Sequence, residues 1–151
     1  MIDKQLEVRK WLKRAFYADK KVKTLELLIR QCRERAERVS VCYEGNDKGK
    51  SSGCENGTEK ALMKLADIEL KAQRQKEKAA DVSGQVWDAI TLLHDDDLEA
   101  ILIHRYMLFH TVEETAEIMN YDSRTVRRKQ SEAIEKLVRK CPCLSSFDVV
   151  E

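Results

Sequence analysis

One apolar seam, with alternating steps of three and four residues, runs through the first 43 positions and constrains the fold more than any other feature. None of its members is charged: Val8, Trp11, Ala15, Ala18, Val22, Leu25, Ile29, Cys32, Ala36, Val39 and Tyr43. A repeat of 3.5 residues keeps one helical face against a partner helix. The seam predicts one helix over about the first 42 residues, about 60 Å long, which cannot bury its apolar stripe alone.

A second seam follows a glycine-rich segment. Its members are Ala61, Leu65, Ile68, Ala72, Gln75, Ala79, Val82, Val86, Ala89 and Leu93, and Gln75 is the polar one, as in seams where a single polar residue sets the register. Residues 44–57 hold four of the five glycines, which predicts a turn or flexible loop, with Thr58 as the N-cap of the next helix. Residues 1–94 therefore predict a coiled-coil-like antiparallel helical hairpin, paired within one chain or between two.

The composition favours an all-α protein. Charged residues make up 36% of the 151 positions, with only five glycines and one proline, which disfavours a turn-dense β-sheet. The 28 Lys and Arg residues nearly balance the 27 Asp and Glu residues, so any nucleic-acid contact has to be local. No apolar window approaches the roughly 18 to 20 residues of a membrane span and no signal-type apolar core is present. We therefore expect a cytoplasmic protein without membrane contact, and reduced cysteines.

Residues 95–140 form a different predicted unit, followed by a tail at 141–151. His94 and the aspartates at 95–97 interrupt the seam and supply an N-cap and carboxylates that complement the next helix dipole. The predicted helices run from Leu98 to about Phe109, from Thr111 to Met119 and from Ser123 to about Lys140. Pro142, between two cysteines, ends the last helix.

The last two of these helices have the spacing of a helix-turn-helix. Such a motif needs a small residue where the helices meet, a residue that tolerates positive φ at the turn, and an apolar anchor in the second helix. Ala116, Asn120 and Val126 meet these needs in that order. The other predicted core members are Ile101, Leu102, Leu108, Thr115, Ile118, Met119, Tyr121, Ile134 and Leu137.

The second helix of the pair has a basic surface. Asp122 stands at the N-cap position, so the first turn is expected to point outward, as in helices that enter a DNA major groove. From Asp122 to Lys140 there are seven basic and three acidic residues, whereas from Leu98 to Tyr121 there are one basic and four acidic. The candidate DNA-binding residues are Ser123, Arg124, Arg127, Arg128, Lys129 and Ser131. The alternative is an amphipathic helix with a solvated basic face.

The stretch from Leu98 to Leu137 resembles region 4 of bacterial sigma-70-type factors, which reads the −35 promoter element. The resembling segments are EAILIHRY at 99–106, TVEETAEIM at 111–119, SRTVRR at 123–128 and AIEKL at 133–137. The whole layout is similar to small phage and prophage proteins of Gram-positive bacteria, whose relatives act as late-gene transcription activators. Where a glycine is common at the turn, this chain has Asn120, which also tolerates positive φ.

The resemblance implies a sequence-specific transcriptional regulator that binds double-stranded DNA. The further partners it implies are RNA polymerase and a second copy of the chain, paired through the hairpin. A complete sigma factor also needs aromatic residues that trap the unstacked bases of the −10 element. Trp11, Phe16 and Tyr17 are too few for that purpose, and Trp11 already belongs to the seam. We therefore expect an adaptor and not a complete sigma factor.

Other interpretations of the sequence stay open. A small-terminase-like DNA-packaging adaptor also joins a helix-turn-helix to a helical oligomerisation region, and a protein-only coiled-coil scaffold needs no DNA. A zinc site could use Cys141 and Cys143, completed by His94, His104 or His110, although paired CxxC spacing is absent. The consecutive carboxylates at 95–97 do not converge on one ion as a metal nuclease requires. No GxSxG, phosphate-binding glycine loop or HExxH occurs, so we expect no enzyme and no cofactor.

Overall fold

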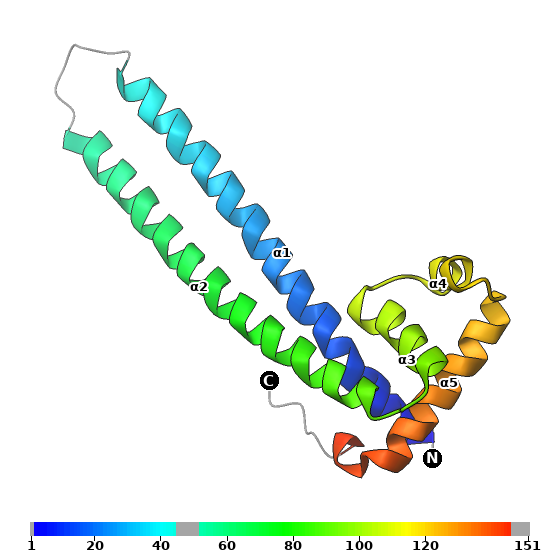
Figure 1. Cartoon of the computed structure of the whole chain (residues 1–151). Coiled ribbons are helices and arrows are strands. Elements are labelled where there is room, and N and C mark those ends of the chain that lie inside the picture. The colour runs from blue at the N-terminus through cyan, green and yellow to red at the C-terminus, as the bar shows by residue number, and fades with distance from the viewer. Residues whose placement is uncertain (1, 45–51, 146–151) are drawn as a thin grey trace. The chain divides into compact units, whose positions relative to one another are not determined.

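The computed structural model describes residues 2–44 and 52–145, and all of its regular structure is helical. The elements are α1 (Ile2–Glu44), α2 (Ser52–Thr91), α3 (Asp96–Leu102), the π-helix η1 (Ile103–Met107), α4 (Val112–Met119), α5 (Ser123–Lys140) and the 3-10 helix η2 (Pro142–Ser145) (Figure 1). No strand occurs in these two ranges, which confirms the all-α class. Within the same ranges, no helix combines the length and the apolar character that crossing a membrane requires.

The chain groups into two compact units. One contains residues 1–18 and 79–151, and the other contains residues 19–78. This grouping differs from the predicted boundary at residue 94, because the start of α1 and the end of α2 share a hydrophobic core with the C-terminal helices. We call the first the core unit and the second the distal unit.

The distal unit consists of the adjoining parts of α1 and α2, which run antiparallel. Glu26 of α1 pairs with Lys76 of α2 at 3.1 Å, and Arg33 of α1 pairs with Glu69 of α2 at 2.5 Å. A later position in α1 thus pairs with an earlier position in α2, as antiparallel helices require. Among the seam members of this unit whose side chains the structure describes, three are buried, Ala61 is exposed and the others are half-buried. The buried members are Val22, Ile68 and Ala72.

The predicted loop at 44–57 was too long. Helix α2 begins at Ser52, so Thr58 lies inside a helix and is not its N-cap. Adding a residue to an existing helix gains a backbone hydrogen bond, and a glycine lowers that gain by only about 1 kcal/mol, so Gly53 and Gly57 do not stop the helix. The remainder of the predicted loop at 45–51, and most of the tail at 146–151, lie outside the described residues.

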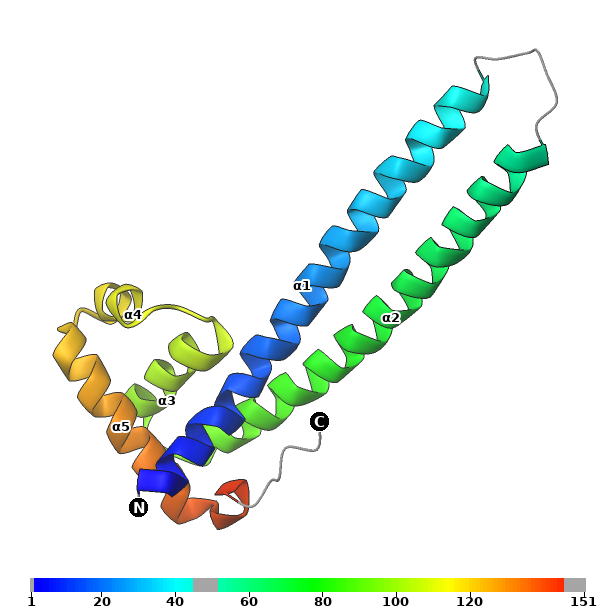
Figure 2. The same ribbon diagram turned by 180° about the vertical axis from the view of Figure 1, so that it is seen from behind.

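The core unit buries a cluster drawn from α1, α2, α3 and α5. Its fully or nearly fully buried aliphatic members are Val8, Leu12, Val86, Ile90, Leu93, Leu98, Leu102, Ile134 and Leu137. Each such side chain stabilises the fold by roughly 1.5–3 kcal/mol relative to exposure. Helix α5 therefore shares a buried core with the start of α1 and the end of α2 (Figure 2).

The helix predicted from Leu98 to Phe109 has a different shape. The α-helix ends at Leu102 and continues as the π-helix η1, with Phe109 at a φ of 59°. Because a π turn holds one extra residue, the side chains that follow are rotated. Leu108, predicted in the core, is 51% exposed, and Phe109 packs against the core instead. Ile118, also predicted in the core, lies on the outer face of α4 and is 53% exposed.

Candidate nucleic-acid interface

Helix α4 begins and ends with strong local signals. The Thr111 hydroxyl accepts the backbone N–H of Glu114 at 3.2 Å, and the Glu114 carboxylate accepts the backbone N–H of Thr111 at 2.7 Å, a capping box. That backbone N–H lowers the pKa of Glu114 below its ordinary value. At the other end Asn120 adopts the left-handed conformation, with φ 54° and ψ 43°, as its place in the turn predicted.

The turn brings α4 and α5 into direct contact. Ala116 and Val126 meet beside Ile101 of α3, and these three side chains are 6%, 0% and 0% exposed. The small residue and the apolar anchor therefore touch, as the spacing predicted. A larger side chain at position 116 has no room beside Val126 without separating the helices.

Asp122 occupies the N-cap position of α5 but does not cap it with its side chain. Its backbone is extended, with φ −74° and ψ 148°, and its carboxylate makes no hydrogen bond to the first turn. The predicted N-cap position and the start of the helix at Ser123 are confirmed. The first backbone N–H groups of α5 are thus available beside the half-buried Ser123.

Three faces of α5 have different chemistry, as follows from a rotation of about 100° per residue. The buried face carries Val126, Gln130, Ala133, Ile134 and Leu137. Gln130 is the polar member, and its amide donates to the Tyr106 hydroxyl at 2.9 Å and accepts from Arg105 at 3.3 Å. Because these partners lie in η1, the buried amide fixes the π-helix against α5.

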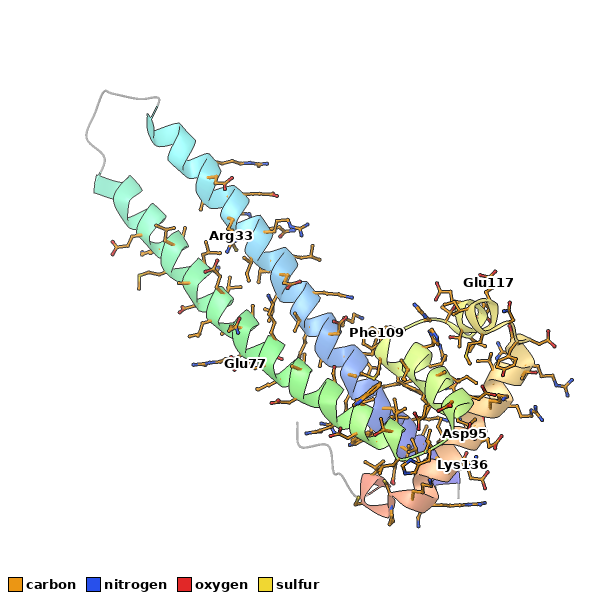
Figure 3. All side chains as sticks on the ribbon, in the orientation of Figure 1. Arg33, Glu77, Asp95, Phe109, Glu117 and Lys136 are labelled. Atoms are coloured by element: carbon orange, nitrogen blue, oxygen red, sulfur yellow. The ribbon has the colours of Figure 1, made fainter. Side chains whose placement is uncertain are left out.

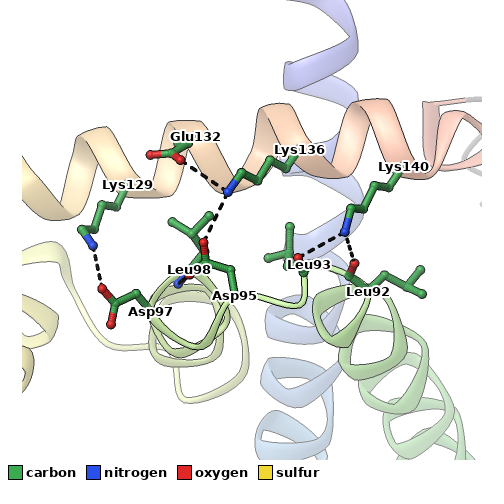
Figure 4. Close-up of polar contacts among 9 residues, drawn as sticks. All are labelled: Leu92, Leu93, Asp95, Asp97, Leu98, Lys129, Glu132, Lys136 and Lys140. Carbon is green, nitrogen blue, oxygen red and sulfur yellow. Dashed lines mark hydrogen bonds and ion pairs between the residues drawn. The ribbon is translucent and has the colours of Figure 1, made fainter.

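A row of three lysines follows one edge of the buried face and holds α5 to the rest of the core unit (Figure 4). Lys129 contacts Asp97 at 2.8 Å, and Lys136 contacts Asp95 at 3.3 Å, the pair labelled side by side in Figure 3. Lys140 donates to the backbone oxygens of Leu92 and Leu93 at 2.8 and 3.2 Å. We call these three residues the lysine row.

The lysine row shifts the titration of its partners. The hydrogen bond from Lys129, together with one from the Tyr121 hydroxyl, lowers the pKa of Asp97, and the Asp97 carboxylate raises the pKa of Lys129. The backbone N–H of Leu98, with a smaller contribution from Lys136, lowers the pKa of Asp95. Asp95 thereby caps α3, as predicted for this acidic cluster.

The opposite face of α5 carries the arginines. Arg124 and Arg128 are exposed, and no hydrogen bond or ion pair joins their guanidinium groups to any described side chain. Arg127 lies 3.5 Å from Glu113, with both side chains about two-thirds exposed, at 67% and 66%. An exposed pair of this kind contributes roughly 0–1 kcal/mol, so Arg127 is easily released to another anion. We call Arg124, Arg127 and Arg128 the arginine stripe.

The predicted binding residues therefore divide into two groups. The arginine stripe lies at the start of α5 with exposed side chains, and Ser123 beside it is half-buried. Lys129 is instead held by Asp97, and only about a fifth of its side chain is exposed. Ser131 is exposed at the end of the stripe, and its hydroxyl accepts a hydrogen bond from Arg9 of α1 at 3.3 Å. Arg9 was missed from the sequence, because 122 positions separate it from Ser131.

The histidines and cysteines considered for zinc do not gather into a metal centre in the described part of the chain. His104 and His110 face each other with their Nδ1 atoms 3.1 Å apart and their ring centroids 5.3 Å apart. This distance suits one N–H···N hydrogen bond between the two rings. No group of three metal-ligating side chains occurs among the described residues. Burial raises the pKa of the Cys141 thiol, which disfavours the thiolate that zinc requires.

Comparison of the chain with protein-family models, with curated proteins and with solved structures finds no match.

Proposed function

We propose that α4, its turn and α5 form a helix-turn-helix that binds double-stranded DNA, with α5 as the recognition helix. The observation that carries the proposal is the arginine stripe. Three guanidinium groups lie on the outward face within the first two turns of α5, while the lysines of the same helix are engaged internally. Early residues of a recognition helix contact base edges, and arginine binds guanine with two hydrogen bonds.

The proposed function is transcriptional regulation of the phage or prophage type, without catalysis and without a cofactor. The resemblance of residues 98–137 to sigma region 4 supports it, and so does the left-handed turn at Asn120. Three outward arginines are few, so we expect non-specific affinity of about 10⁻⁴ to 10⁻⁶ M at physiological salt. Sequence-specific binding then requires a second half-site read by a second copy, or a contact with RNA polymerase.

The test is a paired substitution measured by fluorescence anisotropy with a labelled duplex of about 30 base pairs at low salt. Arg124→Ala with Arg128→Ala removes two cations that have no internal partner, so affinity should fall more than about tenfold with helicity unchanged. The matched control is Arg35→Ala with Arg38→Ala, two exposed arginines of α1 in the distal unit. Equal loss in both variants, or no binding by the parent protein, would contradict the proposal.

Light scattering separates the proposed regulator from the DNA-packaging alternative. A regulator of this kind is expected to be a monomer or a dimer, whereas a small-terminase-like adaptor forms a ring of several subunits. Failure to bind any duplex at any salt concentration would instead favour a protein-only scaffold.

A further inference from the structure

One flank of α1 borders the outward face of α5 within the core unit. Arg9 reaches Ser131 of α5 at 3.3 Å, and the Phe16 ring lies 5.4 Å from the Phe109 ring, between η1 and α4. Positions 9 and 16 are seven apart, so they lie on the same side of the helix. This flank of α1 therefore follows the C-terminal helices over about two helical turns.

The same flank carries a second cation, Lys13. The side chains that α1 buries in the core are Val8, Trp11, Leu12 and Ala15. At 100° per residue, Arg9 and Lys13 both lie to the Ser131 side of that buried face, four residues apart. Lys13 is exposed, and it makes no ion pair with any described residue. Arg14, on the opposite flank, contacts Gln85 of α2 instead.

Arg9 also retains most of its binding capacity. A guanidinium has five N–H donors, and the contact with Ser131 uses one of them on a neutral hydroxyl. The nearest acidic groups of α5 have their own partners, since Glu132 pairs with Lys136 and Glu135 pairs with Arg139. Within the described residues no carboxylate is paired with Arg9. A phosphate oxygen is a stronger acceptor than a hydroxyl and would take these donors.

We propose that Arg9 and Lys13 of α1 bind the phosphate backbone of the DNA beside the groove that α5 occupies, so that the arginine stripe continues across Ser131 onto a second helix. The inference rests on the proposed function and extends it. From Arg124 to Ser131 there are seven steps along α5, about 10 Å. Phosphate contacts from α1 would position the molecule on the duplex, whereas the early residues of α5 read its bases.

The test measures how the observed association constant depends on salt for the full chain. Each phosphate contact contributes a slope of about −0.9 to the plot of log association constant against log salt concentration. Arg9→Ala with Lys13→Ala should flatten the slope by about 1.8 and weaken binding equally on all sequences. The control is Arg35→Ala with Lys64→Ala, which removes one arginine and one lysine from exposed positions of the distal unit.

A second set of variants separates phosphate binding from a structural role. Ser131→Ala removes the only hydrogen-bond partner of Arg9 among the described side chains but keeps its charge, and Arg9→Lys keeps the charge without the planar fork. Both should retain the parent slope, because the slope counts contacts between cations and phosphates and each variant keeps the charge at position 9; the affinity itself is not compared, since Ser131 is a candidate DNA-binding residue. If Ser131→Ala flattens the slope as much as Arg9→Ala, or if neither Arg9 nor Lys13 affects it, the inference is overturned. If neither Arg9 nor Lys13 affects the slope but substitution of Arg124 and Arg128 still weakens binding, the proposed function stands without this inference. If the parent protein does not bind DNA, the proposed function and the inference are both overturned.

Discussion

The two edges of α5 carry three lysines and three arginines and differ in their contacts. On one edge the lysine row contacts Asp97, Asp95 and the turn that follows α2, while on the other the arginine stripe faces outward. Lysine suits the inner edge because its single ammonium reaches carbonyl and carboxylate oxygens on a flexible stem. The planar fork of arginine matches base edges and phosphates, which is what the proposed function requires of the outer edge. A count of charges along the helix does not distinguish the two edges.

The largest effect on stability is expected from a substitution on the buried face of α5, which lies between the two edges. Ile134 is fully buried between α5 and the rest of the core unit. Ile134→Ala should lower the free energy of unfolding by about 2–5 kcal/mol, because it removes buried methyl groups and leaves a cavity. Urea denaturation measures this loss. A change below about 0.5 kcal/mol would show that α5 is not packed as described.

The second prediction compares the loss of two cations from each edge of α5. Lys129→Ala with Lys136→Ala removes as many charges from α5 as Arg124→Ala with Arg128→Ala. The lysine pair should lower the melting temperature, since it removes the ion pairs of Asp97 and Asp95 with α5, and should leave duplex affinity within about threefold of the parent. The arginine pair should leave the melting temperature nearly unchanged and should weaken duplex binding. Calorimetry and anisotropy on the same samples test this, and two identical profiles would remove the distinction between the edges.

The third prediction concerns acid. The pKa values of Asp95, Asp97 and Glu114 are lowered in the folded protein. Their contribution to stability is therefore complete above the unfolded values, about 4, and is lost as pH falls through the lower folded values. Unfolding measured between pH 7 and pH 2 should show a steep decline in this range. The decline should be shallower in Lys129→Met, whereas a Met variant at Arg124 should follow the parent curve.

The fourth prediction is the smallest and concerns the one arginine of the stripe that has an internal partner. Glu113→Gln removes the carboxylate near Arg127 and should change stability by less than about 1 kcal/mol, because both side chains are about two-thirds exposed. Duplex binding should become tighter by a few fold, because Arg127 no longer has to leave the Glu113 carboxylate before it contacts DNA. Weaker binding would indicate that Glu113 positions Arg127 and does not compete for it.

Local patterns in the sequence predicted much of this architecture. The seams, the left-handed Asn120 and the contact of Ala116 with Val126 each depend on residues close in the chain and on fixed helical geometry. The π-helix was not predictable in this way, because its backbone bonds carry no sequence signal of their own and its side chains Arg105 and Tyr106 are held by Gln130, 25 and 24 positions further along the chain. A polar residue in the apolar series of α5 was the signal that could have pointed to it.

The candidate site was predicted only in part for a similar reason. The basic run from 123 to 131 pointed to α5, but it gave Lys129 and Arg128 the same weight, although Lys129 is held by Asp97 and Arg128 is exposed. Which of them is free depends on Asp97, which lies 32 positions away, and on the direction of the buried face. The contribution of Arg9 depends on how α1 packs against α5. Interactions between distant segments leave no periodic signal in either segment.

The contact of Lys140 with the carbonyl oxygens of Leu92 and Leu93 has a consequence for truncation. The carbonyl oxygens of the turn that follows α2 accept hydrogen bonds from an ammonium 48 and 47 positions further along the chain. Proteolysis just before Lys140 would remove these bonds and loosen that turn, far upstream of the cut. A hydrogen-exchange experiment on such a fragment would register faster exchange around Leu92 and Leu93 before any change at the severed end.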